Sequence, residues 1–118
     1  MDSLQASDQA AASVAVAPRV TLADIEAAID GRYDFTAGRA FAAMDMPADM
    51  ACDLLSLCIL RMRNGFMVVG KSAPASPENF NAALGRKFAY EDAVRQLWPL
   101  MGYALRERLM TGMENTHV

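Results

Sequence analysis

The sequence predicts an α+β protein. A short N-terminal helix comes first, and a β-hairpin, which forms a small antiparallel sheet, then packs on a long helix and a C-terminal helix. Asn64-Gly65 separates two apolar, β-rich runs, and both residue types accept the positive φ that a two-residue hairpin turn requires. A long helical segment opens at Ser76-Pro77-Glu78-Asn79, where serine can cap and proline suits the first helical position. Of the 118 residues 53% are apolar, so one modest core is expected.

The chain divides by composition into a core segment and two tails. Residues 1–17 combine Ala, Ser, Gln and Asp without a sustained apolar period, so we expect a disordered tail there. Residues 18–112 are expected to form a single α+β domain, and residues 113–118 a second tail. No apolar run approaches the length of a membrane span, and no basic start precedes an apolar block. We therefore expect no transmembrane segment, no signal peptide and a cytosolic protein.

The first predicted element is a short amphipathic helix. Thr21 can cap it, and Asp24 in its first turn suits the positive end of the helix dipole. Ile25 lies on its apolar face, and Gly31 supplies the end. Residues 32–53 are less regular, and a second short helix or a loop with one apolar face would both fit.

The hairpin and the helices after it are the clearest elements. Residues 54–62 and 66–69 read as its two strands, and such a pair is stable only with a helix, another strand or a partner chain across its face. The long helix is expected over residues 77–97, with Pro99 breaking or kinking it. A last helix is expected over about residues 100–110.

Charge is distributed unevenly along the chain, although the formal net charge is only −3. Residues 19–53 carry three basic and seven acidic side chains, whereas residues 54–112 carry eight basic and four acidic ones. The positive hairpin and helix suit a small anionic ligand better than a long nucleic acid, since the chain as a whole is acidic and lacks a basic tract. A dipolar surface without a ligand is the alternative.

Groups for catalysis are few. The only histidine, His117, is the penultimate residue, so histidine-activated nucleophiles and histidine metal sites are not expected. Cys52 and Cys58 are expected as buried, reduced thiols that form no disulfide. The segment Val69-Gly70-Lys71-Ser72 lacks the earlier glycine and the spacing of a phosphate-binding loop. The sequence therefore favours binding over catalysis, with no metal and no cofactor.

Steps of about 100° per residue give the 77–97 helix two apolar arcs separated by a charged ridge. One arc comprises Phe80, Leu84 and Phe88, the other Ala83, Tyr90, Ala93, Val94 and Leu97, and the ridge Lys87, Glu91 and Arg95. Two apolar arcs predict burial on two sides, one against the hairpin and one against another chain. The ridge is either an i, i+4 ion-pair ladder at a dimer seam or a phosphate-binding surface where subunits join. In the second case Arg86, Lys87 and Arg95 would meet phosphate oxygens, while Tyr90 or Phe80 stacks on a base.

A long ordered set of short motifs spans most of residues 18–109. It comprises Pro18-Arg19-Val20-Thr21, Ile25-Glu26-Ala27-Ala28-Ile29, Arg63-Asn64-Gly65-Phe66, Gly70-Lys71-Ser72-Ala73, Ser76-Pro77-Glu78-Asn79-Phe80, Gly85-Arg86-Lys87, Ala89-Tyr90-Glu91, Ala93, Leu97-Trp98-Pro99-Leu100, Gly102-Tyr103 and Leu105-Arg106-Glu107. Together they resemble a family of small proteins of tailed bacteriophages and prophages, the gp forty-nine / gp sixty-six family. Three positions depart from its pattern: Pro74 replaces a usual Cys, Ala83 a usual acidic residue, and Asp92 an expected Asn, which puts an amide contact to a base there in doubt.

The resemblance implies a role in the host bacterial cytoplasm. Small phage proteins without enzyme signatures are similar in kind to oligomeric sponges that sequester cyclic oligonucleotide or cyclic ADP-ribose signals of bacterial defence. We therefore expect a homo-oligomer, a dimer or tetramer, that binds a cyclic nucleotide without cleaving it. The candidate ligand-binding residues are Ser72, Asn79, Phe80, Arg86, Lys87, Tyr90 and Arg95.

Other functions and placements also fit the sequence. Pockets within one subunit and pockets between subunits are both compatible with it. The alternative function is a protein inhibitor that docks a host or defence enzyme through the Met- and Phe-bearing segment 32–50. A structural role, or an accessory role in DNA metabolism, is a third reading.

Overall fold

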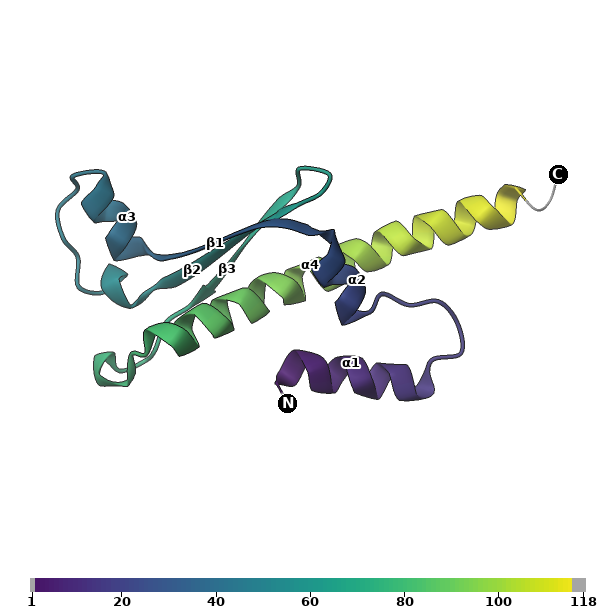
Figure 1. Ribbon diagram of the computed structural model, residues 1–118, viewed down its shortest axis with the longest axis horizontal. Coiled ribbons are helices and arrows are strands. Elements are labelled where there is room, and N and C mark those ends of the chain that lie inside the picture. Colours follow the sequence, from purple (N-terminus) through teal and green to yellow (C-terminus); the bar gives the residue numbers. More distant parts are fainter. Residues whose placement is uncertain (1, 116–118) are drawn as a thin grey trace. The chain divides into compact units, whose positions relative to one another are not determined.

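The computed structural model describes residues 2–115, with side chains described over residues 2–112. It contains two compact units, one formed by residues 29–96 and the other by residues 1–28 together with 97–118. Helices and an antiparallel sheet are both present, so the predicted α+β class is confirmed (Figure 1). The single domain predicted over residues 18–112 and the oligomeric state stay predictions.

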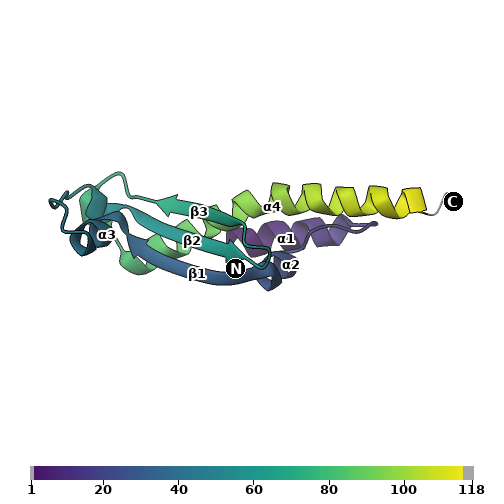
Figure 2. The same cartoon turned by 90° about the horizontal axis from the view of Figure 1, so that it is seen from above.

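The sheet of the 29–96 unit has three antiparallel strands rather than the predicted two. They are β1 (Ile29–Thr36), β2 (Ser56–Met62) and β3 (Met67–Ser72), in the order β1-β2-β3 (Figure 2). The helix-or-loop expectation for residues 32–36 is therefore wrong. Polar residues fill much of β1, and its pairing with β2, which sets Tyr33 opposite Ile59, defines it as a strand. The added strand meets the need of the isolated hairpin for further support.

The hairpin is confirmed, but its turn is of a different type from the one predicted. The Gly65 amide donates to the Met62 carbonyl at 2.9 Å, and the Met62 amide donates to the Phe66 carbonyl at 2.8 Å. Gly65 has φ +88°, whereas the only described non-glycine residue with positive φ is Asp45. The loop thus has three residues, a type I turn followed by a left-handed glycine bulge, and only the glycine needs a positive φ.

Helix α4 (Ala82–Asn115) is one continuous helix that contains Pro99. The predicted start at residues 76–77 is wrong, because Pro77–Asn79 forms a short 3-10 turn, η2, and Asn81 caps α4 by accepting the Leu84 amide at 3.0 Å. Of the two effects predicted for Pro99, the break is wrong, because α4 runs through the proline, and the kink stays a prediction. Trp98, just before the proline, donates its indole N–H to the Val20 carbonyl at 3.2 Å. Tertiary contacts of this kind stabilise a helix at a proline, which has no backbone N–H to donate.

Close backbone packing joins α4 to the sheet within the 29–96 unit. A Cβ at Gly70 would overlap the Ala89 carbonyl oxygen and lie only 2.5 Å from the Ala93 amide nitrogen. Glycine is therefore required where β3 crosses the helix. The buried apolar side chains around this contact come from β2, β3 and α4: Cys58, Leu60, Met62, Val68, Ala89, Ala93 and Val94.

Two side chains of α4 also close the outer edge of β3. The Asp92 carboxylate accepts the Lys71 backbone N–H at 2.9 Å, and the Gln96 amide donates to the Val69 carbonyl at 2.7 Å. Polar edge groups that would otherwise face water are thus satisfied by the helix. Asp92, one of the departures from the family pattern, serves the backbone of the strand in this structure.

The second unit begins with a helix where we expected a disordered tail. Helix α1 (Ser3–Val14) has a capping box in which Asp2 accepts the Gln5 amide at 2.8 Å. Asp8 pairs with Arg19 at 3.0 Å, which ties the helix to the segment before α2. The prediction of a disordered tail over residues 1–17 is therefore wrong. The high alanine content, the Asp2 cap and the buried side chain of Leu4 are sufficient for this segment to form a helix.

Helix α2 (Leu22–Ala28) follows the predicted start but is shorter than predicted, since residue 29 already belongs to β1. Of the tail predicted over residues 113–118, the first three residues continue α4, and residues 116–118, which include His117, lie outside the described residues.

We expect Thr21→Ala to lower the free energy of unfolding by about 1 kcal/mol, because Thr21 and Asp24 form a reciprocal cap. The Thr21 hydroxyl accepts the Asp24 amide at 3.0 Å, and the Asp24 carboxylate accepts the Thr21 amide at 2.9 Å. These bonds hold the pKa of Asp24 below its ordinary value of 3.8, so the stabilisation is present above that value and is lost as pH falls through the lower folded pKa. Urea unfolding at neutral and acidic pH measures both effects. Glu26→Ala, on the exposed side of the same helix, is the control and should change little.

Candidate functional site

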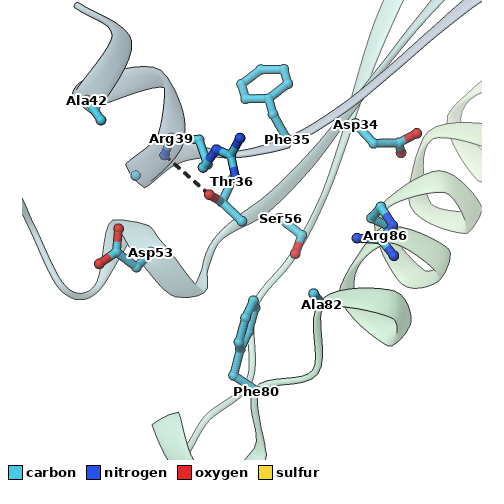
Figure 3. Close-up of a pocket in the computed structure, with 11 residues that line it drawn as sticks. Asp34, Phe35, Thr36, Arg39, Ala42, Asp53, Ser56, Phe80, Ala82 and Arg86 are labelled. Carbon is cyan, nitrogen blue, oxygen red and sulfur yellow. Dashed lines mark hydrogen bonds between the residues drawn. The ribbon is translucent and has the colours of Figure 1, made fainter.

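A cavity of about 640 Å³ lies within the 29–96 unit. Its walls come from the end of β1, from α3 (Ala37–Ala43), from the 3-10 turn η1 (Cys52–Leu54), from β2 and from the start of α4. The lining residues are Asp34, Phe35, Thr36, Gly38, Arg39, Ala42, Asp53, Ser56, Phe80, Ala82 and Arg86. Figure 3 shows Arg39 and Arg86 on opposite sides of Ser56, with Phe80 below them. This volume falls in the range of about 300–1,000 Å³ that is usual for small-molecule sites.

Local backbone interactions position the wall formed by β1 and α3. Thr36 ends β1 and caps α3, its hydroxyl accepting the Arg39 amide at 3.3 Å. A Cβ at Gly38 would overlap the Asp53 carboxylate, so the glycine lets α3 pack directly against η1. The cap and this contact fix where the Arg39 side chain leaves the backbone.

The cavity combines cationic, anionic and aromatic groups. Among the described residues Arg39 and Arg86 form no ion pair, whereas Asp34 pairs with Arg32 at 2.9 Å. Two guanidinium groups without a carboxylate partner can bind phosphate or carboxylate oxygens, and the Phe80 ring offers flat apolar surface, whereas the Phe35 ring points away from Ser56 and Phe80 (Figure 3). The arrangement suits an anion that carries a planar ring.

A smaller cavity of about 190 Å³ adjoins the larger one. Ser56 and Phe80 line both cavities, so this serine and this ring stand between them. The rest of the smaller lining is mainly apolar or amide-bearing: Leu54, Ser72, Ala73, Pro74, Asn79, Asn81, Leu84, Gly85 and Phe88.

The structure brings together four of the seven candidate ligand-binding residues. Phe80 and Arg86 line the larger cavity, and Phe80 lines the smaller one together with Ser72 and Asn79. Lys87, Tyr90 and Arg95 line neither cavity. The Tyr90 ring instead makes a cation–π contact with Arg32, whose guanidinium carbon Cζ lies 4.1 Å from the ring centroid.

Sequence reasoning missed the β1 and α3 wall, and with it Asp34, Phe35 and Arg39. The signal that could have found it is the alternation of Arg32 and Asp34 with Tyr33 and Phe35, which is typical of a strand with two different faces.

The charged ridge of α4 is interrupted at its centre. Glu91 is only 5% exposed, and its Oε2 atom has no hydrogen-bond partner among the described residues. Lys87, one turn earlier, is exposed and forms no ion pair within the described part of the chain. A regular ion-pair ladder along the ridge is therefore not formed at these two positions.

The two apolar arcs of the helix differ in burial. Ala93, Val94 and Leu97 of one arc are buried, as expected for the side that packs on the chain itself. Leu84 and Phe88 of the other arc are 48% and 47% exposed. Burial of this second arc against another chain stays a prediction.

Both cysteines are free, as predicted, but only Cys58 is buried as expected, and Cys52 is partly exposed. Cys58 is buried on β2, and burial, with a smaller effect from Asp34, raises its pKa to about 11. Burial also raises the pKa of Cys52 above its ordinary value of 9.0.

We expect the stability of the protein to decline as pH rises from about 9 towards 11, because the unfolded thiol of Cys58 ionises near 9.0 and the folded one near 11. The stabilisation is complete below the unfolded pKa and is lost as pH rises through the folded pKa. Urea unfolding of the wild type and of Cys58→Val across this range isolates the contribution of the thiol. A difference between the two proteins that does not vary with pH would contradict the assignment.

No group of three or more His, Cys, Asp or Glu side chains that could hold a metal ion occurs among the described residues. None of the described helices is both long and apolar enough to cross a membrane.

Comparisons with known proteins place the chain in a family. Residues 20–109 match the model of the Phage protein (N4 Gp49/phage Sf6 gene 66) family. Searches of curated proteins and of solved structures gave no match. Since the family model covers well over half of the 118 residues, the chain belongs to the phage protein family of N4 Gp49 and Sf6 gene 66.

Proposed function

We propose that this phage protein binds a cyclic nucleotide signal of bacterial immunity in the host cytoplasm and sequesters it without cleaving it. The observation that carries the proposal is the cavity of about 640 Å³ in which Arg39 and Arg86 accompany the aromatic ring of Phe80. Membership of a phage family makes a role against host defence a reasonable biological context.

The cavity chemistry matches what a cyclic nucleotide presents. Guanidinium groups bind phosphate oxygens through paired, charge-assisted hydrogen bonds, and aromatic rings stack on bases. Asp53 and the hydroxyl of Ser56 lie in the same lining and can accept or donate hydrogen bonds to base edges or ribose hydroxyls. Sequestration needs only tight binding and slow release, and the proposed role requires no catalytic group.

Calorimetric titration with a panel of cyclic dinucleotides, cyclic trinucleotides and cyclic ADP-ribose tests the proposal. We expect saturable heat with at least one member and none with the corresponding linear mononucleotide. Heating the complex and identifying the released ligand then separates binding from hydrolysis, and an intact ligand is expected. Absence of heat with every member at tens of micromolar protein would contradict the proposal.

Inhibition of a host or defence enzyme by direct docking is the second candidate. Met44, Met46 and Met50, which follow α3, are 60%, 45% and 84% exposed, and adaptable methionine surfaces are common at protein interfaces. The variant Met46→Glu with Met50→Glu separates the two functions. If docking is the function, this variant loses protection of phage against the host defence while ligand binding stays unchanged. If sequestration is the function, protection persists.

A further inference from the structure

The two edges of the sheet differ in how they are finished. At the β3 edge, Asp92 and Gln96 of α4 bind the outward backbone groups of Lys71 and Val69. At the other edge, β1 pairs with β2 on one side and, within the described residues, has no strand on its outer side. Figure 2 shows β1 as the outermost strand. An eight-residue strand with an unpaired edge is a template for another strand.

We propose that the free edge of β1 binds β1 of a second copy of this chain in antiparallel orientation, with Tyr33 opposite Tyr33 of the second copy across the two-fold axis. The three strands of each copy then form one continuous sheet. This inference concerns self-association and does not depend on the proposed ligand.

Charge complementarity favours this register over the two next to it. Side chains directly opposite in an antiparallel pair share a face, so the two-fold axis lies between the two strands and sets one residue of β1 opposite the same residue of the second copy. A register that sets Arg32 opposite Arg32 brings two like charges together, and so does one that sets Asp34 opposite Asp34. A register that sets Tyr33 opposite Tyr33 places Arg32 opposite Asp34 of the second copy, twice over, and the two side chains are 41% and 21% exposed.

The opposite face of the strand fits the same register. The two Tyr33 side chains then lie together at the axis, and Gly31 lies opposite Phe35 of the second copy. The Arg61 guanidinium lies over Gly31, 3.0 Å from where a Cβ would stand, so the Phe35 ring would pack against this guanidinium. Tyr33 is 48% exposed, and its hydroxyl accepts a hydrogen bond from Arg61 at 2.9 Å. An aromatic pair at the axis covers part of a sheet face that a single chain leaves open.

Charge reversal and charge exchange test the pairing by sedimentation equilibrium over a range of protein concentrations. Arg32→Asp and Asp34→Arg, made singly, each place like charges opposite each other and are expected to weaken dimerisation at least about tenfold. The double variant exchanges the two charges and is expected to restore the dimer to within about threefold of the wild type. Circular dichroism confirms that each variant is folded. A monomeric wild type, or single variants that dimerise as well as the wild type, would overturn the proposal.

Disulfide trapping is an independent test. Cα atoms of residues directly opposite in antiparallel strands are about 4.5–5.5 Å apart, within reach of a disulfide. In a Cys52→Ser background, Tyr33→Cys is expected to form a covalent dimer on oxidation. Val69→Cys is the matched control, since Val69 pairs with Ile59 on the same face of the sheet but lies on the closed edge strand. Equal cross-linking of the two variants, or none with Tyr33→Cys, would overturn the proposed register.

Discussion

Replacement of Gly70 by alanine is expected to lower the free energy of unfolding by about 3 kcal/mol. The added Cβ would overlap the Ala89 carbonyl oxygen and lie 2.5 Å from the Ala93 amide nitrogen. Both atoms belong to the backbone of α4, which cannot rotate away as a side chain can. The helix must therefore move off β3, and the bonds of Asp92 and Gln96 to the strand edge should weaken with it.

Gly102→Ala is the matched control for this substitution. Gly102 lies inside the same helix, but a Cβ there meets nothing within 4 Å. Alanine is favoured over glycine in a helix interior, so this variant should gain roughly 0.5–1 kcal/mol. Urea unfolding followed by circular dichroism measures both variants. Equal stability of the two would show that β3 and α4 do not approach as closely as the structure has them.

Arg86→Ala is expected to weaken binding of the cyclic nucleotide roughly tenfold to a hundredfold, while the fold stays intact. Arg86 lines the larger cavity, is exposed, and forms no ion pair among the described residues, so its loss removes charge-assisted hydrogen bonds to the ligand and little else. Arg39→Ala should have an effect of similar size from the opposite wall.

Lys87→Ala is the control for electrostatic attraction in general. Lys87 is the next residue along the helix and carries the same charge, but it lines neither cavity. We expect its removal to change the affinity by less than about threefold, which is the size of a screened surface effect. The sequence alone assigned Arg86 and Lys87 the same phosphate-binding role, whereas in the structure only Arg86 lines a cavity. Equal losses in Arg86→Ala and Lys87→Ala would indicate a binding surface along the charged ridge instead of in the cavity.

The strongest local signals in the sequence predicted elements correctly. Asn64-Gly65 predicted the hairpin, and Thr21 as a cap with Asp24 in the first turn predicted the start of α2. Elements defined by long-range contacts were missed. β1 is half polar, and it is a strand because it pairs with β2 along its length. Proline, a strong local signal, predicted a helix end that tertiary packing overrides at Pro99.

The candidate site was predicted in part for the same reason. Phe80 and Arg86 lie on the helical segment that the sequence identified, and they do line the larger cavity. The opposite wall comes from residues 34–53, far away in sequence. The alternation at residues 32–35 can indicate a strand, but no local pattern places Arg39 across from Arg86. Helical spacing could not predict the burial of Glu91 either. The spacing gives the direction in which a side chain leaves the helix, but it does not show which side of the helix the sheet covers.

The closed edge of β3 sets a limit on growth. A sheet with both sides open can polymerise without end, since each added molecule exposes a fresh template, and fibres are the result. Here Asp92 and Gln96 occupy one side, so a molecule that joins through β1 offers no further strand for the next. Assembly through the sheet therefore stops at a dimer. Substitutions that remove the Asp92 and Gln96 side chains from the edge of β3 would allow further strands to add, and the protein would aggregate.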